Sequence, residues 1–527
     1  MNQHGSESDS TKRSSNNATT QVAPGSSWKA RLLALKNVDS ESNEGQGLKR
    51  VLGAFELTMF GIGAIIGTGI FVLTGTAAAG GQNHVGAGPA IVLSFFITAI
   101  ACGFAALCYA EFASMIPVSG SAYTYAYASF GELVAWIIGW DLILEYAVGN
   151  VAIAIGWSSY FLNVLNHYGV HLPAWLCIEP MTVRNALVAP NDFSPAIVEL
   201  SNKVMATGPN VGGWIFSINL PAVIIVLLIS GLLYFGVRES ARMNAGLVFI
   251  KFIMIALFLW AGLPHVDFAK HWNPFMPNGF TGVMAGASII FFAYIGFDAV
   301  STAAEESKNP QRDLPIAMIS SLLICTLLYV VVSIVLTGMV PLNILQNSKP
   351  VAEALTSVGE SSIATIISLG AVLSITSVLL VMQLAQTRIF FAMSRDGLLP
   401  EFLSKVHPRY GTPHICTLLT GLLVAIPAGF IDINIAAEAC NIGTLFAFVL
   451  VAIGIMILRV RRPDLPRGFV TPFVWVTAPL CAISCIALMS FLTTVTWYRF
   501  GIWLVIGLAI YFVYGFHRSK LRPQTMN

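Results

Sequence analysis

Long apolar stretches recur along this chain and predict its elements directly. Each of twelve segments approaches or exceeds the roughly 20 residues that a helix needs to cross ~30 Å of hydrocarbon. The third and eighth are long enough to project beyond a bilayer or to tilt strongly. The pattern predicts an all-α membrane protein with spans at 55–79, 88–112, 132–164, 218–236, 243–263, 280–303, 315–339, 362–392, 413–430, 434–458, 471–493 and 497–516.

Composition supports the membrane assignment. Hydrophobic residues make up 56% of the 527 residues and charged residues only 10%, with a mean hydropathy of +0.75. A water-soluble domain could not bury this much apolar surface. The first 46 residues are polar and lack the apolar core of a signal peptide, so we expect a disordered cytoplasmic tail.

Basic residues predict the orientation. Most of the 28 lysines and arginines fall in the terminal tails and in every second loop. The positive-inside rule therefore places both termini in the cytoplasm, in a multi-pass protein of the plasma (inner) membrane. The same rule explains the net charge of +2, so that charge gives no reason to expect a nucleic-acid partner.

A glycine-rich segment stands out in the first span. Gly61-Ile-Gly-Ala-Ile-Ile-Gly-Thr-Gly-Ile70 holds four glycines, each costing a helix interior roughly 1 kcal/mol relative to alanine. Close helix packing through Gly63 and Gly67 is one interpretation. The other is a helix that unwinds within the membrane, as in transporters, where such breaks bind substrate.

A second break supports an internal repeat. In the sixth span Phe291-Phe-Ala-Tyr-Ile-Gly-Phe-Asp298 interrupts an apolar run with Gly296 and a carboxylate. Because five spans separate the two breaks, the second unit starts from the opposite side of the membrane. We expect a tail at 1–46, a first inverted repeat at 47–265, a second at 280–458, two added spans at 471–516 and a C-terminal tail at 517–527.

An unwound segment exposes backbone groups that match an amino acid. The N–H groups of Gly67, Thr68 and Gly69 would begin a half-helix whose positive end can meet a carboxylate. Carbonyls freed near Ile65 in the first span, and near Phe292 and Ile295 in the sixth, can accept hydrogen bonds from an ammonium group. The pattern favours a zwitterionic substrate.

Several motifs carry a family resemblance. GIGAIIGTGIFV, GWDLILEYAVG, VRESARMNAGLVFIK, FFAYIGFDAVSTAAEESKNPQRDLP and QTRIFFAMSRDGLLP resemble those of cationic amino acid transporters and their bacterial relatives in the amino acid, polyamine and organocation superfamily. The likeness covers roughly residues 48–515. It implies a leucine-transporter-type fold of five plus five spans, broken at spans 1 and 6, with spans 11 and 12 added. It also implies substrate contacts at Ile65, Thr68, Gly69, Phe292 and Ile295.

Lys251 lies about eight residues into the fifth span. A charge within a bilayer is costly, so the side chain either snorkels to the inner surface or has a function. The resemblance places a matching lysine where sodium binds in sodium-coupled relatives. That implies proton coupling, with H+ as the coupling ion and no bound metal or other cofactor.

Acidic residues provide further candidates. Asp141 and Glu145 lie four residues apart in the third span and so share one helix face. The resemblance implies that Glu145 acts near the substrate or in proton handling, with Asp141 and Asp298 as secondary candidates. Capping of the following half-helix explains Asp298 almost as well. Met382, in the eighth span, is a packing residue or a wall of the side-chain pocket.

Cysteine usage adds no site. Of eight cysteines, only Cys177 lies in a predicted outside loop, so neither an outside disulfide nor a zinc site is expected. The outside loop at 166–217 has no chemistry that its residues alone define.

We therefore expect a proton-coupled importer of cationic or small neutral amino acids, working by alternating access, and not an enzyme. An amino acid exchanger and a membrane-embedded amino acid sensor are the alternatives. The expected partners are the amino acid, the lipid bilayer and an unidentified small membrane protein.

Overall fold

The computed structural model describes residues 32, 51–81, 84–116, 121–236 and 241–520. The predicted N-terminal tail, apart from Leu32, lies outside the described residues, and so do residues 521–527 of the predicted C-terminal tail.

Helices occupy all twelve predicted segments. They are α3 (Ala54–Ile65) with η2 (Gly69–Leu73) and α4 (Thr74–Ala79), α5 (Ile91–Met115), α7 (Glu132–His167), α10 (Leu220–Tyr234), α11 (Ala241–Gly262), α13 (Gly279–Ile290) with η7 (Phe291–Tyr294) and η8 (Asp298–Glu306), α14 (Pro310–Met339), α17 (Ser361–Arg395), α18 (His414–Phe430), α19 (Ile433–Arg461), α20 (Val474–Ser490), and α21 (Thr494–Ile510) with η10 (Tyr511–Gly515) and α22 (Phe516–Arg518).

Among the described residues, nine helical segments are long and apolar enough to cross a membrane. Three further apolar helices are shorter: α10 has 15 residues, and α18 and α20 have 17 each. The chain is therefore a helical, multi-pass membrane protein. A crossing by all twelve segments stays a prediction.

Short elements connect these helices. They are η3 (Gly88–Ala90), α6 (Ser121–Ser129), η4 (Ala174–Leu176), α8 (Pro180–Val188), η5 (Pro190–Asp192), α9 (Pro195–Thr207), η6 (Leu263–His265), α12 (Phe268–His271), α15 (Leu342–Leu345), α16 (Pro350–Ser357) and η9 (Glu401–Ser404). Two antiparallel two-residue ladders pair β1 (Gly80–Gly81) with β2 (His84–Val85), and β3 (Asn210–Val211) with β4 (Trp214–Ile215).

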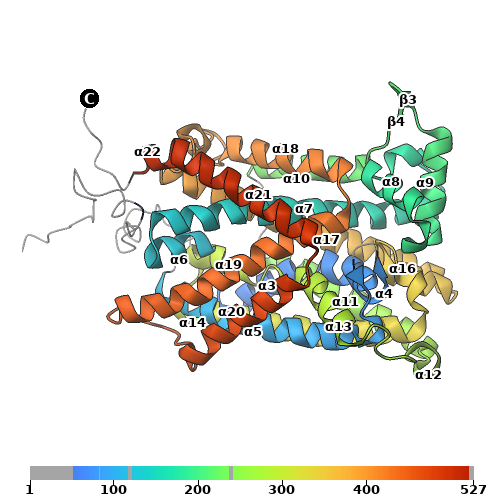
Figure 1. Cartoon of the computed structure of the whole chain (residues 1–527), viewed down its shortest axis with the longest axis horizontal. Helices are drawn as coiled ribbons and strands as arrows, with labels where there is room; N and C mark the ends of the chain where they lie inside the picture. Colours follow the sequence, from blue (N-terminus) through green and yellow to red (C-terminus); the bar gives the residue numbers. More distant parts are fainter. Residues whose placement is uncertain (1–31, 33–50, 82–83, 117–120, 237–240, 521–527) are drawn as a thin grey trace, which may run out of the picture.

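The long helices run along the length of the molecule, with α7 through its middle (Figure 1). As their sequence lengths predict, α7 and α17 are the longest of the described helices, at 36 and 35 residues, and they pack against each other. At one end α8, α9 and the β3–β4 hairpin gather, while α22 lies at the other end (Figure 1).

Two helices are interrupted at the glycines that the sequence singles out. Helix α3 ends at Ile65, Ile66 is extended, and the helix resumes at Gly69. In the second interruption η7 ends at Tyr294 and η8 begins at Asp298. Gly296 between them has φ +123°, a conformation that side chains other than glycine strongly resist.

The two interruptions pack directly against each other. A Cβ atom added to Gly69 would lie 2.2 Å from Ala293 Cα, and one added to Gly296 would lie 3.0 Å from the carbonyl carbon of Ala64. Neither contact can be relieved by turning a side chain, because the opposing atoms belong to the backbone. Glycine at these positions lets the two broken helices cross in contact.

We predict that Gly69→Ala lowers the melting temperature of the detergent-solubilised protein. The added methyl must push the η7 backbone away, and overpacking of this kind typically costs about 1–3 kcal/mol. Gly103→Ala is the matched control, since a Cβ there meets nothing within 4 Å and alanine favours the helix. Equal melting temperatures for the two variants would contradict the tight crossing.

Candidate functional site

A small cavity lies where the broken helices meet. Its volume is about 20 Å³, which accommodates roughly one water molecule, so the site must widen to admit an amino acid. The structure brings together all eight residues that the sequence predicts to bind substrate, and each lines this cavity: Ile65, Gly67, Thr68, Gly69, Glu145, Phe292, Ile295 and Met382.

The cavity combines apolar walls with polar atoms that lack partners. Ile153 of α7 and Val378 of α17 join Phe292 and Met382 in the walls. Within the described part of the chain, Thr68 Oγ1 and one carboxyl oxygen of Glu145 are buried without a hydrogen-bond partner. Buried polar atoms are normally bonded, so these two are available to a ligand.

Lys251 of α11 contacts the interruption of α3. Its Nζ donates hydrogen bonds to the carbonyl oxygens of Gly63 (2.6 Å) and Ile66 (2.8 Å), and the side chain is fully buried. These carbonyls lack their usual helical donors because the helix stops. The interpretation as a lysine snorkelling to the membrane surface is therefore wrong.

Two further residues hold the interruption, and the sequence analysis missed both. The hydroxyl of Tyr329, on α14, lies 2.8 Å from the Ile65 carbonyl oxygen and 2.9 Å from that of Ala293. Ser374 of α17 donates to the Ile66 carbonyl at 3.2 Å. Tyr329 thus joins the two broken helices through one hydroxyl, and Ile65, predicted to receive a substrate ammonium, already has a donor.

The secondary acidic candidates lie beside the cavity but do not line it. Both carboxyl oxygens of Asp141 are buried without a partner in the described structure, and a Cβ on Gly443 of α19 would lie 2.9 Å from one of them. Asp298 accepts from the Gly296 amide (3.2 Å) and the Tyr146 hydroxyl (3.3 Å).

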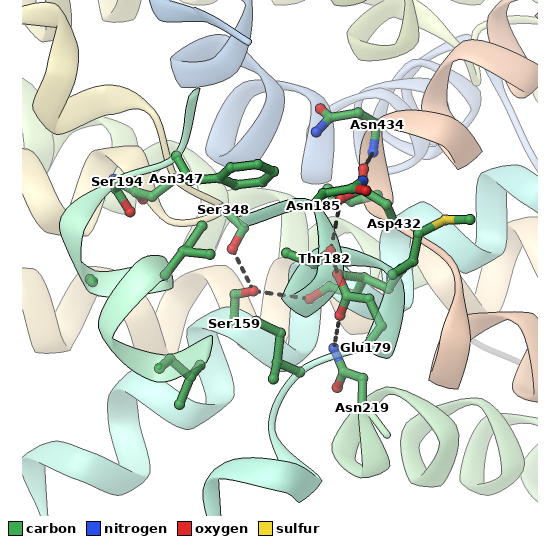
Figure 2. Close-up of a pocket in the computed structure, with 18 of the residues that line it drawn as sticks. Ser159, Glu179, Thr182, Asn185, Ser194, Asn219, Asn347, Ser348, Asp432 and Asn434 are labelled. Carbon is green, nitrogen blue, oxygen red and sulfur yellow. Dashed lines mark hydrogen bonds between the residues drawn. The ribbon is translucent and has the colours of Figure 1, made fainter. Parts of the chain in front are cut away.

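A much larger chamber opens at the end of the molecule that carries α8 and α9. Its volume is about 1260 Å³, and many of its wall groups are amides, hydroxyls and carboxyls (Figure 2). Val72 and Ile155 line the chamber, whereas Thr68 and Ile153 line the small cavity. About one helical turn of side chains therefore separates the two spaces.

The opposite end is closed by backbone pairing. The amides of Val51 and Leu52 donate to the Glu306 carbonyl at 3.0 Å, and the Lys308 amide donates to that of Leu52 at 2.8 Å. Arg388 of α17 pairs with the Glu306 carboxylate at 3.4 Å. The closure on this side involves backbone as well as side chains.

We predict that Tyr329→Phe weakens binding of an amino acid and lowers the melting temperature. The change keeps the ring but removes the donor shared by the Ile65 and Ala293 carbonyls, and losing a buried partner costs about 1–3 kcal/mol. Titration of the purified protein with leucine, followed by thermal shift, measures both effects.

Tyr511→Phe is the matched control. It also removes a buried tyrosine hydroxyl, which bonds Glu132 at 2.9 Å, far along the chain from either interruption. If both variants bind the amino acid as the wild type does, the hydroxyl does not organise the site.

Sequence comparisons relate this chain to known proteins. A family model described as amino acid permease matches residues 52–513. The branched-chain amino acid permease BcaP of Bacillus subtilis (strain 168) is 46% identical over 93% of this chain and 98% of its own length. The methylthioribose transporter of the same organism is 45% identical over 92% and 97%.

More distant relatives include eukaryotic transporters. The chloroplastic cationic amino acid transporter 9 of Arabidopsis thaliana is 36% identical over 80% of this chain and 68% of its own length. With a family match that spans most of the chain and relatives covered almost end to end, this protein belongs to the amino acid permease family.

Proposed function

We propose that the protein imports amino acids together with protons by alternating access, as a secondary active transporter. The carrying observation is the cavity between the two interruptions, which is lined by residues of both broken helices and by apolar side chains of α7 and α17. The backbone at the interruptions would meet the α-amino and α-carboxylate groups of a zwitterion, and the apolar side chains would meet its side chain. An inverted repeat of the leucine-transporter type would account for the paired interruptions. In this proposal the protein lies in the plasma membrane with both termini in the cytoplasm.

The substrate that the cavity fits best is a neutral amino acid with an aliphatic side chain. Ile153, Phe292, Val378 and Met382 provide apolar contacts, and Glu145 is the one carboxylate or cationic side chain among the described lining residues. The similarity to a branched-chain amino acid permease supports this choice. A cationic amino acid is the second candidate, because the unpartnered oxygen of Glu145 could accept from its side chain.

Lys251 is the proposed coupling residue. Its ammonium supplies hydrogen bonds to carbonyls at the end of α3, so protonation stabilises this arrangement of the break. Loss of the proton removes one of the three N–H donors and the positive charge. A proton gained from one side and lost to the other would thus alternately fix and release the broken helix. An exchanger that moves no net protons is the alternative mechanism.

We predict that Lys251→Met abolishes leucine accumulation driven by an acid exterior in proteoliposomes, while exchange of leucine for leucine at equal pH persists. Lys251→Arg tests the titration separately, since arginine keeps hydrogen-bond donors but does not release its proton. It too should fail to accumulate substrate. If either folded variant accumulates leucine in response to a pH gradient, Lys251 is not the coupling group. If leucine uptake by the wild type does not depend on the gradient, the exchanger is favoured.

We also predict that Glu145→Gln reduces uptake of labelled leucine and labelled arginine by the same factor, because Glu145 handles protons for any substrate. Competition between the two amino acids in wild type and variant measures this. Selective loss of arginine transport would instead identify Glu145 as the acceptor for a cationic side chain. Asp141→Asn, one helical turn away and outside the cavity lining, controls for general loss of a buried acid.

A further inference from the structure

The segment 174–215 forms an outer lobe with a small core of its own. Ile178, Val183 and Val204 are buried together, and Trp175 and Leu200 pack against them. This cluster is separate from the main core of the bundle. The outer lobe lines one side of the chamber, so any movement of the lobe against the bundle would change the width of the chamber.

One contact between the lobe and α19 runs through the hydroxyl of Thr182. Thr182 of α8 places its Oγ1 2.6 Å from Glu179 Oε1 and 2.8 Å from Asp432 Oδ2. Figure 2 shows the three side chains in succession along one wall of the chamber. A hydroxyl has one hydrogen to donate, so it cannot donate to both carboxylates. The second short contact requires a proton on one of the two acids.

The surroundings show which acid holds that proton. Both acids precede a helix, Asp432 the 29-residue α19 and Glu179 the nine-residue α8, and a helix N-terminus favours an anion. Asp432 makes the side-chain cap, because its Oδ1 accepts from the Asn434 amide at 2.8 Å, whereas Glu179 makes no side-chain cap of α8. Glu179 has a weaker partner for its other oxygen, the Asn219 side-chain amide at 3.2 Å. Burial of Glu179 and the nearby charge of Asp432 raise the pKa of the Glu179 carboxyl to about 7.

Other charged groups around the chamber have partners or lie elsewhere on its wall. On α9 Lys203 pairs with Glu199 at 2.7 Å, and on α16 Lys349 pairs with Glu353 at 3.3 Å. On α19 Glu438 accepts from the hydroxyls of Thr493 and Thr496. The side chains that α7 and the residue before α10 place next to Glu179 are uncharged. They are Ser158 and Asn219, and the Ser158 hydroxyl donates to Asn219 Oδ1 at 2.6 Å. The remaining charged or titratable wall residues are His84, His171, Cys177, Asp192 and Arg499.

We propose that Glu179, Thr182 and Asp432 form a proton-dependent latch that closes the outer lobe onto α19. With Glu179 protonated, its O–H donates to Thr182 and the threonine donates to Asp432, so all three groups are satisfied. With Glu179 ionised, two buried carboxylates flank one hydroxyl and repel each other. In the orientation that the positive-inside rule predicts, the chamber faces the outside of the cell, and the latch responds to external pH. It regulates access to the chamber and does not require that protons drive uptake.

The direction of the pH effect follows from the pKa of Glu179. In the closed lobe the pKa of Glu179 is about 7, against an ordinary 4.5. An opening that returns this carboxyl to water would restore its ordinary pKa, so closing takes up a proton between these two pH values. Closure should strengthen by up to roughly tenfold for each unit by which the pH falls through this window. Above about pH 7 both states are ionised and the dependence ends.

Hydrogen–deuterium exchange of the full-length protein in detergent micelles tests the latch without any transport assay. We expect the amides of α8 to become more protected as the pH falls from 8 to 5, after correction for the intrinsic exchange rate. Glu179→Gln is neutral at every pH and should remove this dependence. Asp432→Asn removes the repelling charge while keeping a helix-capping side chain, and should move the transition to lower pH.

Glu199→Gln is the control, because it removes an exposed carboxylate from the same lobe and should leave the transition where it is. Protection of α8 that does not vary with pH in the wild type, or that varies identically in Glu179→Gln, would overturn the proposal. A failure of proton-driven uptake would leave it standing, since exchange protection reports on the lobe alone.

Discussion

The architecture depends on how the backbone groups released by one helix interruption are satisfied. Stopping α3 inside a membrane protein leaves carbonyls that water cannot reach, and each would be costly if left alone. Lys251, Tyr329 and Ser374 supply donors from α11, α14 and α17. Three helices far apart in sequence are thereby fixed around the same few peptide groups. The interruption is stable because the surrounding helices provide the hydrogen-bond donors that the missing helical turn would have provided.

The same contacts can also let the interruption change shape. A continuous helix satisfies its carbonyls rigidly, whereas side-chain donors can be withdrawn one at a time. Tyr329 has one hydrogen for two carbonyls on different broken helices, so neither bond is fully independent of the other. A ligand group that takes over one carbonyl would leave the tyrosine free to bond the other. This gives the two half-sites a physical means of influencing each other.

Much of the centre could be predicted from sequence because its signals are local. Glycines within a long apolar run mark an interruption, and a lysine deep in a span marks a buried partner, so Gly69, Gly296 and Lys251 were identifiable. Tyr329 and Ser374 were not, because an aromatic or small polar residue in a span is ordinary until its neighbours are known. Thr182 meets Asp432 across 250 residues, and no local pattern in the 166–217 loop indicates that contact.

The difference between the small cavity and the chamber has an energetic consequence. An amino acid cannot occupy a space of about 20 Å³, so part of its interaction energy must go into separating the walls. The observed dissociation constant then exceeds the intrinsic one by the inverse of the fraction of molecules already open. For a carrier this is useful, since a ligand held at full strength would leave slowly. A compound that wedges the walls apart without letting them close again would bind better than any transported substrate and would act as an inhibitor.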